Sequence, residues 1–212
     1  MKCDRSHMLL YAVTDRSWLN GKTLYENVEK ALKGGATCLQ LREKELGYDE
    51  FLKEAFEIKK LCAKYHVPFI INDSVDIAIA CEADGIHVGQ SDMDALNVRE
   101  KVGLKMIVGV SVQTVDQALK AQKSGADYLG VGAAFSTSTK LDADTVSHET
   151  MRQICKAVSI PVVAIGGINK QNIKELKGTR VDGVAVISAI FAKEDIEAET
   201  RELLRLSSQI EY

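Results

Sequence analysis

A chain of 212 residues has the length of one folded domain rather than two. Hydrophobic residues make up 46% of it, which is enough for a large core and excludes a globally disordered chain. The formal charge is −3 and no basic block occurs, so nucleic acid is excluded as the main partner, and an anionic ligand must be met by a few placed cations.

Short apolar runs alternate with longer amphipathic stretches along the chain. The apolar runs predict strands at residues 9–13, 37–42, 68–72, 85–88, 106–110, 128–131, 161–165 and 183–187. The stretches between them predict helices near 22–34, 48–65, 74–81, 94–101, 114–124, 147–157, 170–177 and 195–209. Eight strands, each followed by a helix, indicate a parallel sheet. Because 212 residues divided among eight units leave about 26 each, the pattern favours closure into a single (β/α)8 TIM barrel.

Neither a linker nor a low-complexity segment interrupts the chain, so residues 1–212 are predicted to form one domain, with residues 1–7 as a flexible N-terminal extension. The first residues lack the apolar core of a signal peptide, and no apolar run approaches the ~18 residues that span a membrane. The five cysteines lack metal-binding spacing, and four of them, Cys38, Cys62, Cys81 and Cys155, are predicted to be small buried hydrophobes rather than catalytic thiols. We therefore expect a cytoplasmic protein without a membrane partner; a homo-oligomer is compatible with the sequence.

The predicted second strand ends in alternating polar side chains. Because strand side chains alternate between two faces, Gln40, Arg42 and Lys44 share one face, and Leu39 and Leu41 share the other. The leucines are expected beneath the helices, which leaves the polar face inside the barrel. A guanidinium there needs an anion, and arginine suits a phosphate through paired hydrogen bonds. The alternative is a structural arginine–glutamate pair.

Two carboxylates follow neighbouring strands, Asp73 after the third and Asp92 after the fourth. The active end of a TIM barrel is formed by the carboxyl ends of its strands, so both should lie at one mouth. Oxygen ligands with room for water suit Mg²⁺ bridging to a diphosphate. Each aspartate alone is also explained as a helix N-cap, and it is the pairing opposite Arg42 and Lys44 that favours a metal site.

The loop at 132–140 concentrates hydroxyl groups beside Lys140 and follows the sixth strand. Hydroxyls, backbone N–H groups and a lysine make a phosphate cradle, although a flexible surface loop is the alternative. Ser111 ends the fifth strand, Gly167 follows the seventh, and a short helix after the eighth strand offers further N–H groups. His87 reads as a polar core residue more readily than as a general base, because no carboxylate partner is visible.

Taken together these motifs resemble thiamine-phosphate synthase, over residues of about 9–204. The pieces that carry the resemblance are Gln40–Lys44, Asn72-Asp73, His87–Asp92, Gly109–Ser111, Thr137–Lys140, Gly166-Gly167 and Val186–Ser188. The resemblance implies a pyrimidine-diphosphate site formed by Gln40, Leu41, Arg42, Glu43, Lys44, Asn72, Ser111 and Lys140, with Arg42, Lys44, Lys140 and Ser111 as the catalytic set. It implies a thiazole-phosphate site at Thr137, Ser138, Thr139, Gly167, Ile187 and Ser188, and one Mg²⁺ per subunit at Asp73 and Asp92. The chain departs from many relatives in lacking a proline before Thr137.

The implied reaction joins a hydroxymethylpyrimidine diphosphate to a thiazole phosphate and releases diphosphate. It suits a dissociative substitution, since the attacking thiazole nitrogen has no proton to lose and the sequence offers no evident general base. Two alternatives stay open. A thiazole tautomerase of the same barrel type would need neither Mg²⁺ nor the diphosphate cations, and a ligand-sensing barrel would bind the phosphates without turnover.

Overall fold

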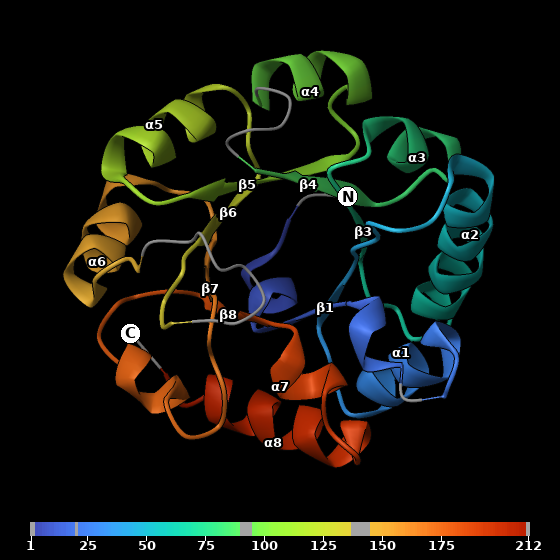
Figure 1. Cartoon of the computed structure of the whole chain (residues 1–212). Coiled ribbons are helices and arrows are strands. Elements are labelled where there is room, and N and C mark those ends of the chain that lie inside the picture. Colours follow the sequence, from blue (N-terminus) through green and yellow to red (C-terminus); the bar gives the residue numbers. More distant parts are fainter. Residues whose placement is uncertain (1–2, 20, 90–94, 137–144, 211–212) are drawn as a thin grey trace.

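The computed structural model describes residues 3–19, 21–89, 95–136 and 145–210. Eight parallel strands form one closed barrel, in which each strand pairs with the next along the chain and β8 returns to β1 (Figure 1). The strands are β1 (Leu10–Val13), β2 (Cys38–Leu41), β3 (Phe69–Asn72), β4 (Gly85–Val88), β5 (Ile107–Val112), β6 (Tyr128–Val131), β7 (Val162–Ile165) and β8 (Gly183–Val186). The predicted TIM barrel is confirmed, and each strand ends within two residues of its predicted bounds.

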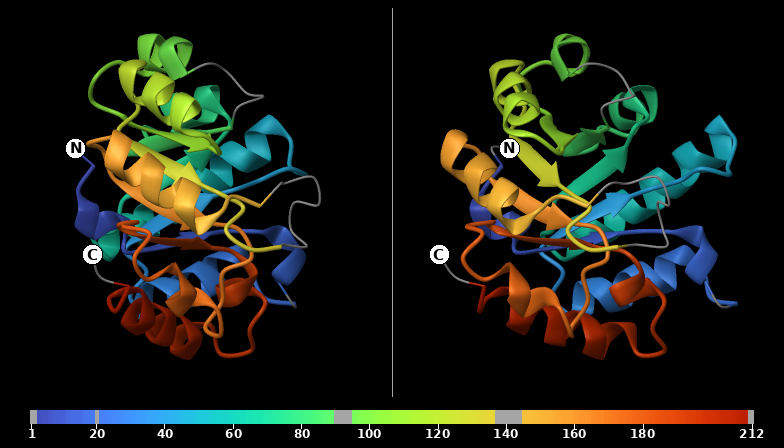
Figure 2. Two further views of the ribbon diagram at one scale, coloured as in Figure 1. Left: turned by 90° about the vertical axis from the view of Figure 1, so that its left-hand side faces the viewer. Right: turned by 60° about the vertical axis from the view of Figure 1, so that its left-hand side comes forward.

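Helices surround the barrel on its outside (Figure 2). They are α1 (Leu24–Lys33), α2 (Tyr48–Lys64), α3 (Val75–Ala80), α4 (Ala95–Val102), α5 (Val115–Lys123), α6 (His148–Ala157), α7 (Ser188–Phe191) and α8 (Ile196–Ser207). The helix predicted at 170–177 is instead one turn of 3-10 helix, Ile173–Leu176, between β7 and β8. Within the ranges given above, none of the helices is long and apolar enough to cross a membrane.

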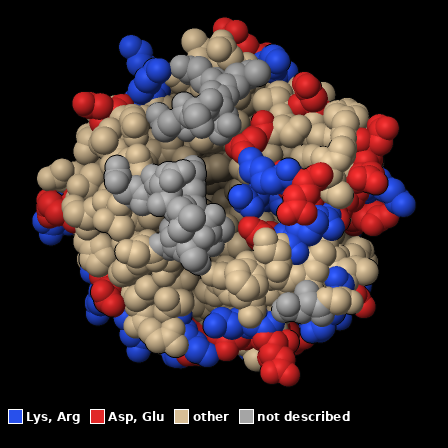
Figure 3. All heavy atoms as spheres, viewed as in Figure 1, with Lys and Arg blue, Asp and Glu red and all other residues tan. Residues whose placement is uncertain are grey.

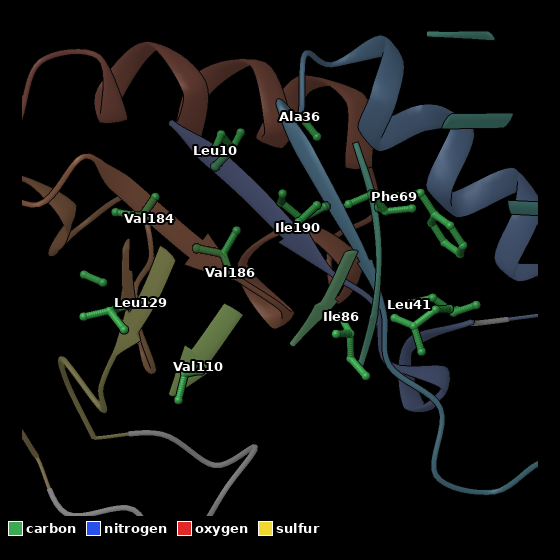
Figure 4. Packing of buried hydrophobic residues seen from close by; sticks show 14 of the residues in the cluster. Leu10, Ala36, Leu41, Phe69, Ile86, Val110, Leu129, Val184, Val186 and Ile190 are labelled. Atoms are coloured by element: carbon green, nitrogen blue, oxygen red, sulfur yellow. The ribbon is translucent and has the colours of Figure 1, made fainter. Parts of the chain in front are cut away.

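The alternation of strand side chains divides the buried residues into two layers. One layer fills the space between the strands and the helices, where Leu10, Leu41 and Phe69 pack (Figure 4). The other fills the barrel itself and consists of Met8, Tyr11, Val13, Cys38, Ile70, Ile107, Tyr128, Val163 and Ala185. Residues that continue the second set along each strand, such as Gln40 and His87, therefore point into the barrel toward its mouth.

A repeated hydrogen bond fixes the opposite end of the barrel. The residue before each even-numbered strand accepts the backbone N–H at the start of the preceding strand, at distances of 2.8–2.9 Å. The acceptors are Thr37, Asp84, Asp127 and Asp182, and the donors are Leu10, Phe69, Val108 and Val162. These side chains satisfy strand-end N–H groups that would otherwise lack partners, so this end of the barrel is built for stability.

The N-terminal segment closes that same end. Residues Arg5–Met8 form a 3-10 helix capped by Asp4, and Met8 is buried with the barrel interior. Arg5 forms an ion pair with Asp182 and donates to the carbonyl oxygen of Ser159 at 3.2 Å. Structure and sequence prediction differ here, because part of the interval predicted as a flexible extension forms a helical turn with contacts across the chain.

Candidate active site at the mouth of the barrel

The carboxyl ends of the strands surround a hollow on one face of the molecule (Figure 3). Basic and acidic side chains gather along one side of it, near β3 as labelled in Figure 1. Two of the cations belong to the segment after β2. Arg42 Nη1 donates to Asp15 Oδ2 at 2.8 Å, and Lys44 Nζ donates to Asp73 Oδ2 at 2.5 Å. Both of these predicted phosphate-binding cations are therefore held by carboxylates at the mouth.

Leu41 and Glu43, the residues on either side of Arg42, make other contacts. One carboxylate oxygen of Glu43 accepts the N–H groups of Lys44 and Glu45, both at 2.7 Å, and the other accepts from Arg16 Nε at 2.8 Å. Burial raises the pKa of Glu43, but the hydrogen bonds from this loop and from Arg16 outweigh it, and the pKa is lowered. Glu43 thus shapes the loop that carries Lys44, while Leu41 packs under the helices. The arginine–glutamate pair considered from sequence involves Arg16 rather than Arg42.

Asp73 occupies an uncommon backbone conformation directly after β3. Its φ is +60°, a left-handed value that aspartate tolerates better than most residues. Its N–H donates to the carbonyl oxygen of His87 at 2.9 Å, and Asn72 Nδ2 donates to Asp73 Oδ1 at 3.0 Å. The N-cap position of α3 belongs to Ser74, so the helix-cap explanation of Asp73 fails. These contacts fix the carboxylate at the mouth beside Lys44.

The donor set at this rim suits Mg²⁺. In the described ranges no three His, Cys, Asp or Glu side chains cluster closely enough to hold a metal ion. Mg²⁺ commonly takes one or two carboxylates and completes its octahedral shell with water and substrate phosphate, so the Asp73 carboxylate fits such a site. Asp92, the second predicted ligand, lies outside the described residues.

A chain of hydrogen bonds crosses the barrel interior below the mouth. Gln40 Nε2 donates to the hydroxyl of Tyr11 at 2.8 Å, and the hydroxyls of Tyr11 and Tyr128 lie 2.8 Å apart. The Tyr128 hydroxyl lies 2.9 Å from His87 Nδ1, and His87 Nε2 lies 2.9 Å from Ser111 Oγ. The chain therefore joins two predicted site residues, Gln40 and Ser111, on different strands.

Sequence reasoning missed the two tyrosines of this chain. The available signal was a pair of glycines at inward-facing positions of β5 and β6. A Cβ atom at Gly109 would lie 2.1 Å from Tyr128 Cζ, and one at Gly130 would lie 3.2 Å from His87 Cε1. These glycines leave the space that the two rings fill.

The loops after β6 and β7 pack on one another. The N–H groups of Ala134 and Phe135 donate to the carbonyl oxygens of Ile165 and Gly166 at 2.8 and 3.0 Å. Gly167 has φ of +67°, and a Cβ there would lie 2.5 Å from the carbonyl oxygen of Ser136. Glycine is therefore required for this close approach.

The predicted thiazole-phosphate residues are only partly described. Gly167 follows β7, whereas Ile187 and Ser188 follow its barrel neighbour β8, with Ile187 packed against the interior layer. Thr137, Ser138, Thr139 and Lys140 lie outside the described residues.

The cysteines show no sign of catalytic activation. All five are without a disulfide, and Cys38, Cys62 and Cys81 are buried. Burial raises the pKa of every one of these thiols, to about 12 for the half-buried Cys3 and Cys155. Because the thiolate is the reactive form, these side chains act as hydrophobes.

Comparison with known proteins agrees with this geometry. The family model described as thiamine monophosphate synthase matches residues 10–190. The chain belongs to this family. A thiamine-phosphate synthase of Clostridium botulinum (strain Eklund 17B / Type B) is 55% identical over 194 residues, covering 92% of this chain and 91% of that protein. One from Clostridium tetani (strain Massachusetts / E88) is 53% identical, covering 92% and 93%.

A solved structure supports the same assignment. The thiamine phosphate pyrophosphorylase from Pyrococcus furiosus superposes with a TM-score of 0.90 at 41% identity, covering 97% of this chain and 98% of that one. Members of the thiamine monophosphate synthase family are enzymes, so the mouth of this barrel is best interpreted as an active site.

Proposed function

We propose that this chain is a thiamine-phosphate synthase. It joins 4-amino-2-methyl-5-(diphosphooxymethyl)pyrimidine to 4-methyl-5-(2-phosphooxyethyl)thiazole, giving thiamine phosphate and diphosphate. Family membership supports this reaction. The observation that carries it in the structure is the pairing of Arg42 with Asp15 and of Lys44 with Asp73 after β2, which provides cations for a diphosphate and, at Asp73, a carboxylate suited to Mg²⁺.

The two substrates are assigned to two sides of the mouth. The pyrimidine diphosphate is proposed to lie against Gln40, Arg42, Lys44, Asn72, Ser111 and Lys140, with the segment of Leu41 and Glu43 contributing backbone. The thiazole phosphate is proposed to lie against Gly167, Ile187, Ser188 and the hydroxyls of Thr137, Ser138 and Thr139. One Mg²⁺ per subunit would be held by Asp73 and Asp92.

Arg42 and Lys44 must change partners when the diphosphate binds. Both are now paired with carboxylates, and both are only partly exposed, with side-chain exposures of 29% and 50%. Phosphate oxygens offer the same kind of acceptor with more charge, so the cations transfer from Asp15 and Asp73 to the substrate. When bound, Mg²⁺ adds positive charge at the leaving diphosphate.

The residues at the mouth stabilise charge rather than move protons. As the bond to the diphosphate breaks, negative charge grows on the leaving oxygens, and Arg42 and Lys44 are placed to offset it. The pyrimidine methylene carries transient positive charge until the neutral thiazole nitrogen attacks. Both ring nitrogens of His87 are hydrogen-bonded, to Tyr128 and to Ser111, so His87 is poorly suited to serve as a general base.

A coupled assay for diphosphate tests the proposal, with both substrates together and with each alone. Diphosphate and thiamine phosphate in equal amounts, formed only when both substrates and Mg²⁺ are present, support it. Conversion of the thiazole alone would indicate a tautomerase, and binding without any product would indicate a sensing barrel. Either result would refute the proposed reaction.

Cellular location and assembly are also proposals. The charge balance and the reduced cysteines support a cytoplasmic enzyme whose partners are small phosphorylated molecules rather than nucleic acid or membrane. A homo-oligomer is compatible with this function, and light scattering on the purified protein tests it.

A further inference from the structure

The interior chain from Gln40 to Ser111 has a direction. Burial raises the pKa of Tyr11 and Tyr128 well above the usual value, so each ring keeps its hydroxyl proton. A tyrosine hydroxyl has a single proton, which it can donate to only one neighbour. Once one member of the chain is fixed as donor or acceptor, the members that follow are fixed in turn.

In this structure the amide nitrogen of Gln40 sets that direction. Because this nitrogen donates to the Tyr11 hydroxyl, the order in which each hydroxyl along the chain both accepts and donates has Tyr11 donating to Tyr128, 2.8 Å away, and Tyr128 donating to His87 Nδ1, 2.9 Å away. A neutral His87 then carries its proton on Nε2 and donates it to Ser111 Oγ. The Ser111 hydroxyl proton is consequently directed away from His87.

The direction of the chain also sets the hydrogen-bonding roles of its two end groups, the amide oxygen of Gln40 and the hydroxyl of Ser111. Gln40 is 4% exposed, and its Oε1 makes no hydrogen bond in the described ranges. In those ranges Asn27 Oδ1 is the sole fully buried side-chain nitrogen or oxygen without a partner, so Gln40 Oε1 is not fully buried. The Gln40 oxygen is therefore reached from the mouth. For the chain to run in the opposite direction, the Gln40 amide would have to rotate by about 180° so that its oxygen faces Tyr11, and every hydrogen bond in the chain would have to exchange donor and acceptor.

We propose that Tyr11, Tyr128 and His87 are positioning residues that fix the hydrogen-bonding sense of the site, so that Gln40 accepts and Ser111 donates. This inference rests on the proposed function for its ligand, a pyrimidine ring. An exocyclic amino group on the ring can donate a hydrogen bond to the oxygen of Gln40, and an acceptor on the same substrate can accept one from the hydroxyl of Ser111. A 4-oxo ring, which presents an acceptor in place of the amino group, would set two acceptors against one another and leave buried groups unpaired.

The experiment compares the 4-amino pyrimidine diphosphate with its 4-oxo analogue in the wild type, Tyr128→Phe and Tyr11→Phe. Each substitution removes one hydroxyl and breaks the chain without adding volume. Tyr65→Phe is the matched control, because its hydroxyl donates to Glu29 at 3.1 Å on the outside of the barrel. Thermal melting verifies that each variant folds.

We expect the wild type to favour the amino ring in kcat/KM. The broken chain lets the Gln40 amide turn over, so the preference should fall at least ~10-fold in Tyr128→Phe and Tyr11→Phe, the size of one mismatched hydrogen bond. Turnover of the amino ring should change less than the preference does, and Tyr65→Phe should match the wild type. An unchanged preference in both chain variants would overturn the proposal.

A spectroscopic measurement tests the chain without any turnover. Nitrogen-15 NMR of the histidine rings, with His87→Asn to assign the signal, reports which ring nitrogen carries the proton. We expect the proton on Nε2 in the wild type, and a proton on Nδ1 would overturn the proposed direction. If the wild type forms no product with either ring, the proposed function has failed, and the NMR result still decides the direction of the chain.

Discussion

We expect Lys44 to oppose metal binding when the protein is alone and to favour it when diphosphate is present, and one substitution can separate these two effects. In the absence of substrate its ammonium group lies 2.5 Å from Asp73 Oδ2, on the carboxylate proposed to bind Mg²⁺. A divalent ion must displace the lysine to reach that oxygen, whereas a diphosphate gives the displaced lysine a new partner. Lys44→Met keeps the length of the side chain and removes the charge. We predict that this variant binds metal more tightly when alone and more weakly together with diphosphate.

The magnitude follows from the exposure of the pair. The side chains of Lys44 and Asp73 are 50% and 26% exposed, so solvent screens them and the ion pair contributes about 0.2–1 kcal/mol. Repulsion between the displaced lysine and a divalent ion about 6 Å away adds roughly 1 kcal/mol in water before screening by salt. Together these free energies predict about 5–30-fold tighter binding of the metal alone.

With diphosphate present the sign reverses. A hydrogen bond to a charged group contributes about 1.5–3 kcal/mol, so the loss of Lys44 should weaken the ternary complex by about 10–150-fold. Titration of the substrate-free protein with Mn²⁺, followed by electron paramagnetic resonance, measures the first effect. Calorimetry with diphosphate at saturating metal measures the second.

Lys170→Met is the control, since Lys170 Nζ lies 2.7 Å from Glu199 and the two side chains are 42% and 22% exposed. It should change neither quantity. Weaker or unchanged Mn²⁺ binding by Lys44→Met would refute the masking of Asp73, and so would Mn²⁺ affinity that survives Asp73→Asn.

Three further predictions concern the metal, the mechanism and the loop after β2. EDTA should abolish turnover and Mg²⁺ restore it, and Asp73→Ala should lose at least ~10²-fold in kcat/KM; full activity in EDTA would refute the metal assignment. His87→Asn should keep turnover of the amino pyrimidine within ~10-fold, short of the 10²–10⁴-fold of a general base, while a trifluoromethyl group in place of the ring methyl should slow turnover steeply by destabilising the developing cation. Glu43→Gln should lower the melting temperature near neutral pH, and because the pKa of Glu43 is lowered in the folded state, the difference from the wild type should shrink as pH falls below the usual 4.5. A difference in melting temperature that stays constant down to pH 3 would contradict the proposed role of the Glu43 carboxylate.

The barrel could be predicted because its sequence signal is local and repeated. Each strand is a short apolar run, and motifs such as Ala83-Asp84-Gly85 and Val181-Asp182-Gly183 mark where strands begin. The structure gives these motifs a common physical cause, since Asp84 and Asp182 accept the first N–H of the preceding strand. Alternation along β2 likewise sufficed to place Gln40 inside the barrel. The turn at Ile173–Leu176 was predicted as a longer helix, because the distance left between β7 and β8 is not encoded in local periodicity.

Side-chain contacts between distant parts of the sequence could not be predicted either, because they too are not encoded in local periodicity. Arg16 rather than Arg42 pairs with Glu43, and nothing in the local order of residues distinguishes the two arginines. The interior chain is the stronger case. Tyr11 and Tyr128 are 117 residues apart, and each alone reads as a core aromatic. Only barrel closure brings their hydroxyls together, and only the missing side chains of Gly109 and Gly130 make room for Tyr128 and His87.

The same geometry explains how a site whose described residues include no evident proton-transfer group can still be selective. The cations at the rim recognise charge, which diphosphates of many kinds would share. The barrel interior adds a polarity that depends on the order of donors and acceptors from Gln40 to Ser111. The rim alone would bind any diphosphate, whereas the interior accepts only one arrangement of ring donors and acceptors. Together they restrict which diphosphate can place its reactive methylene carbon at the mouth. Selectivity and charge stabilisation then belong to different layers of the barrel, so substitutions in the interior chain should change the first while sparing the second.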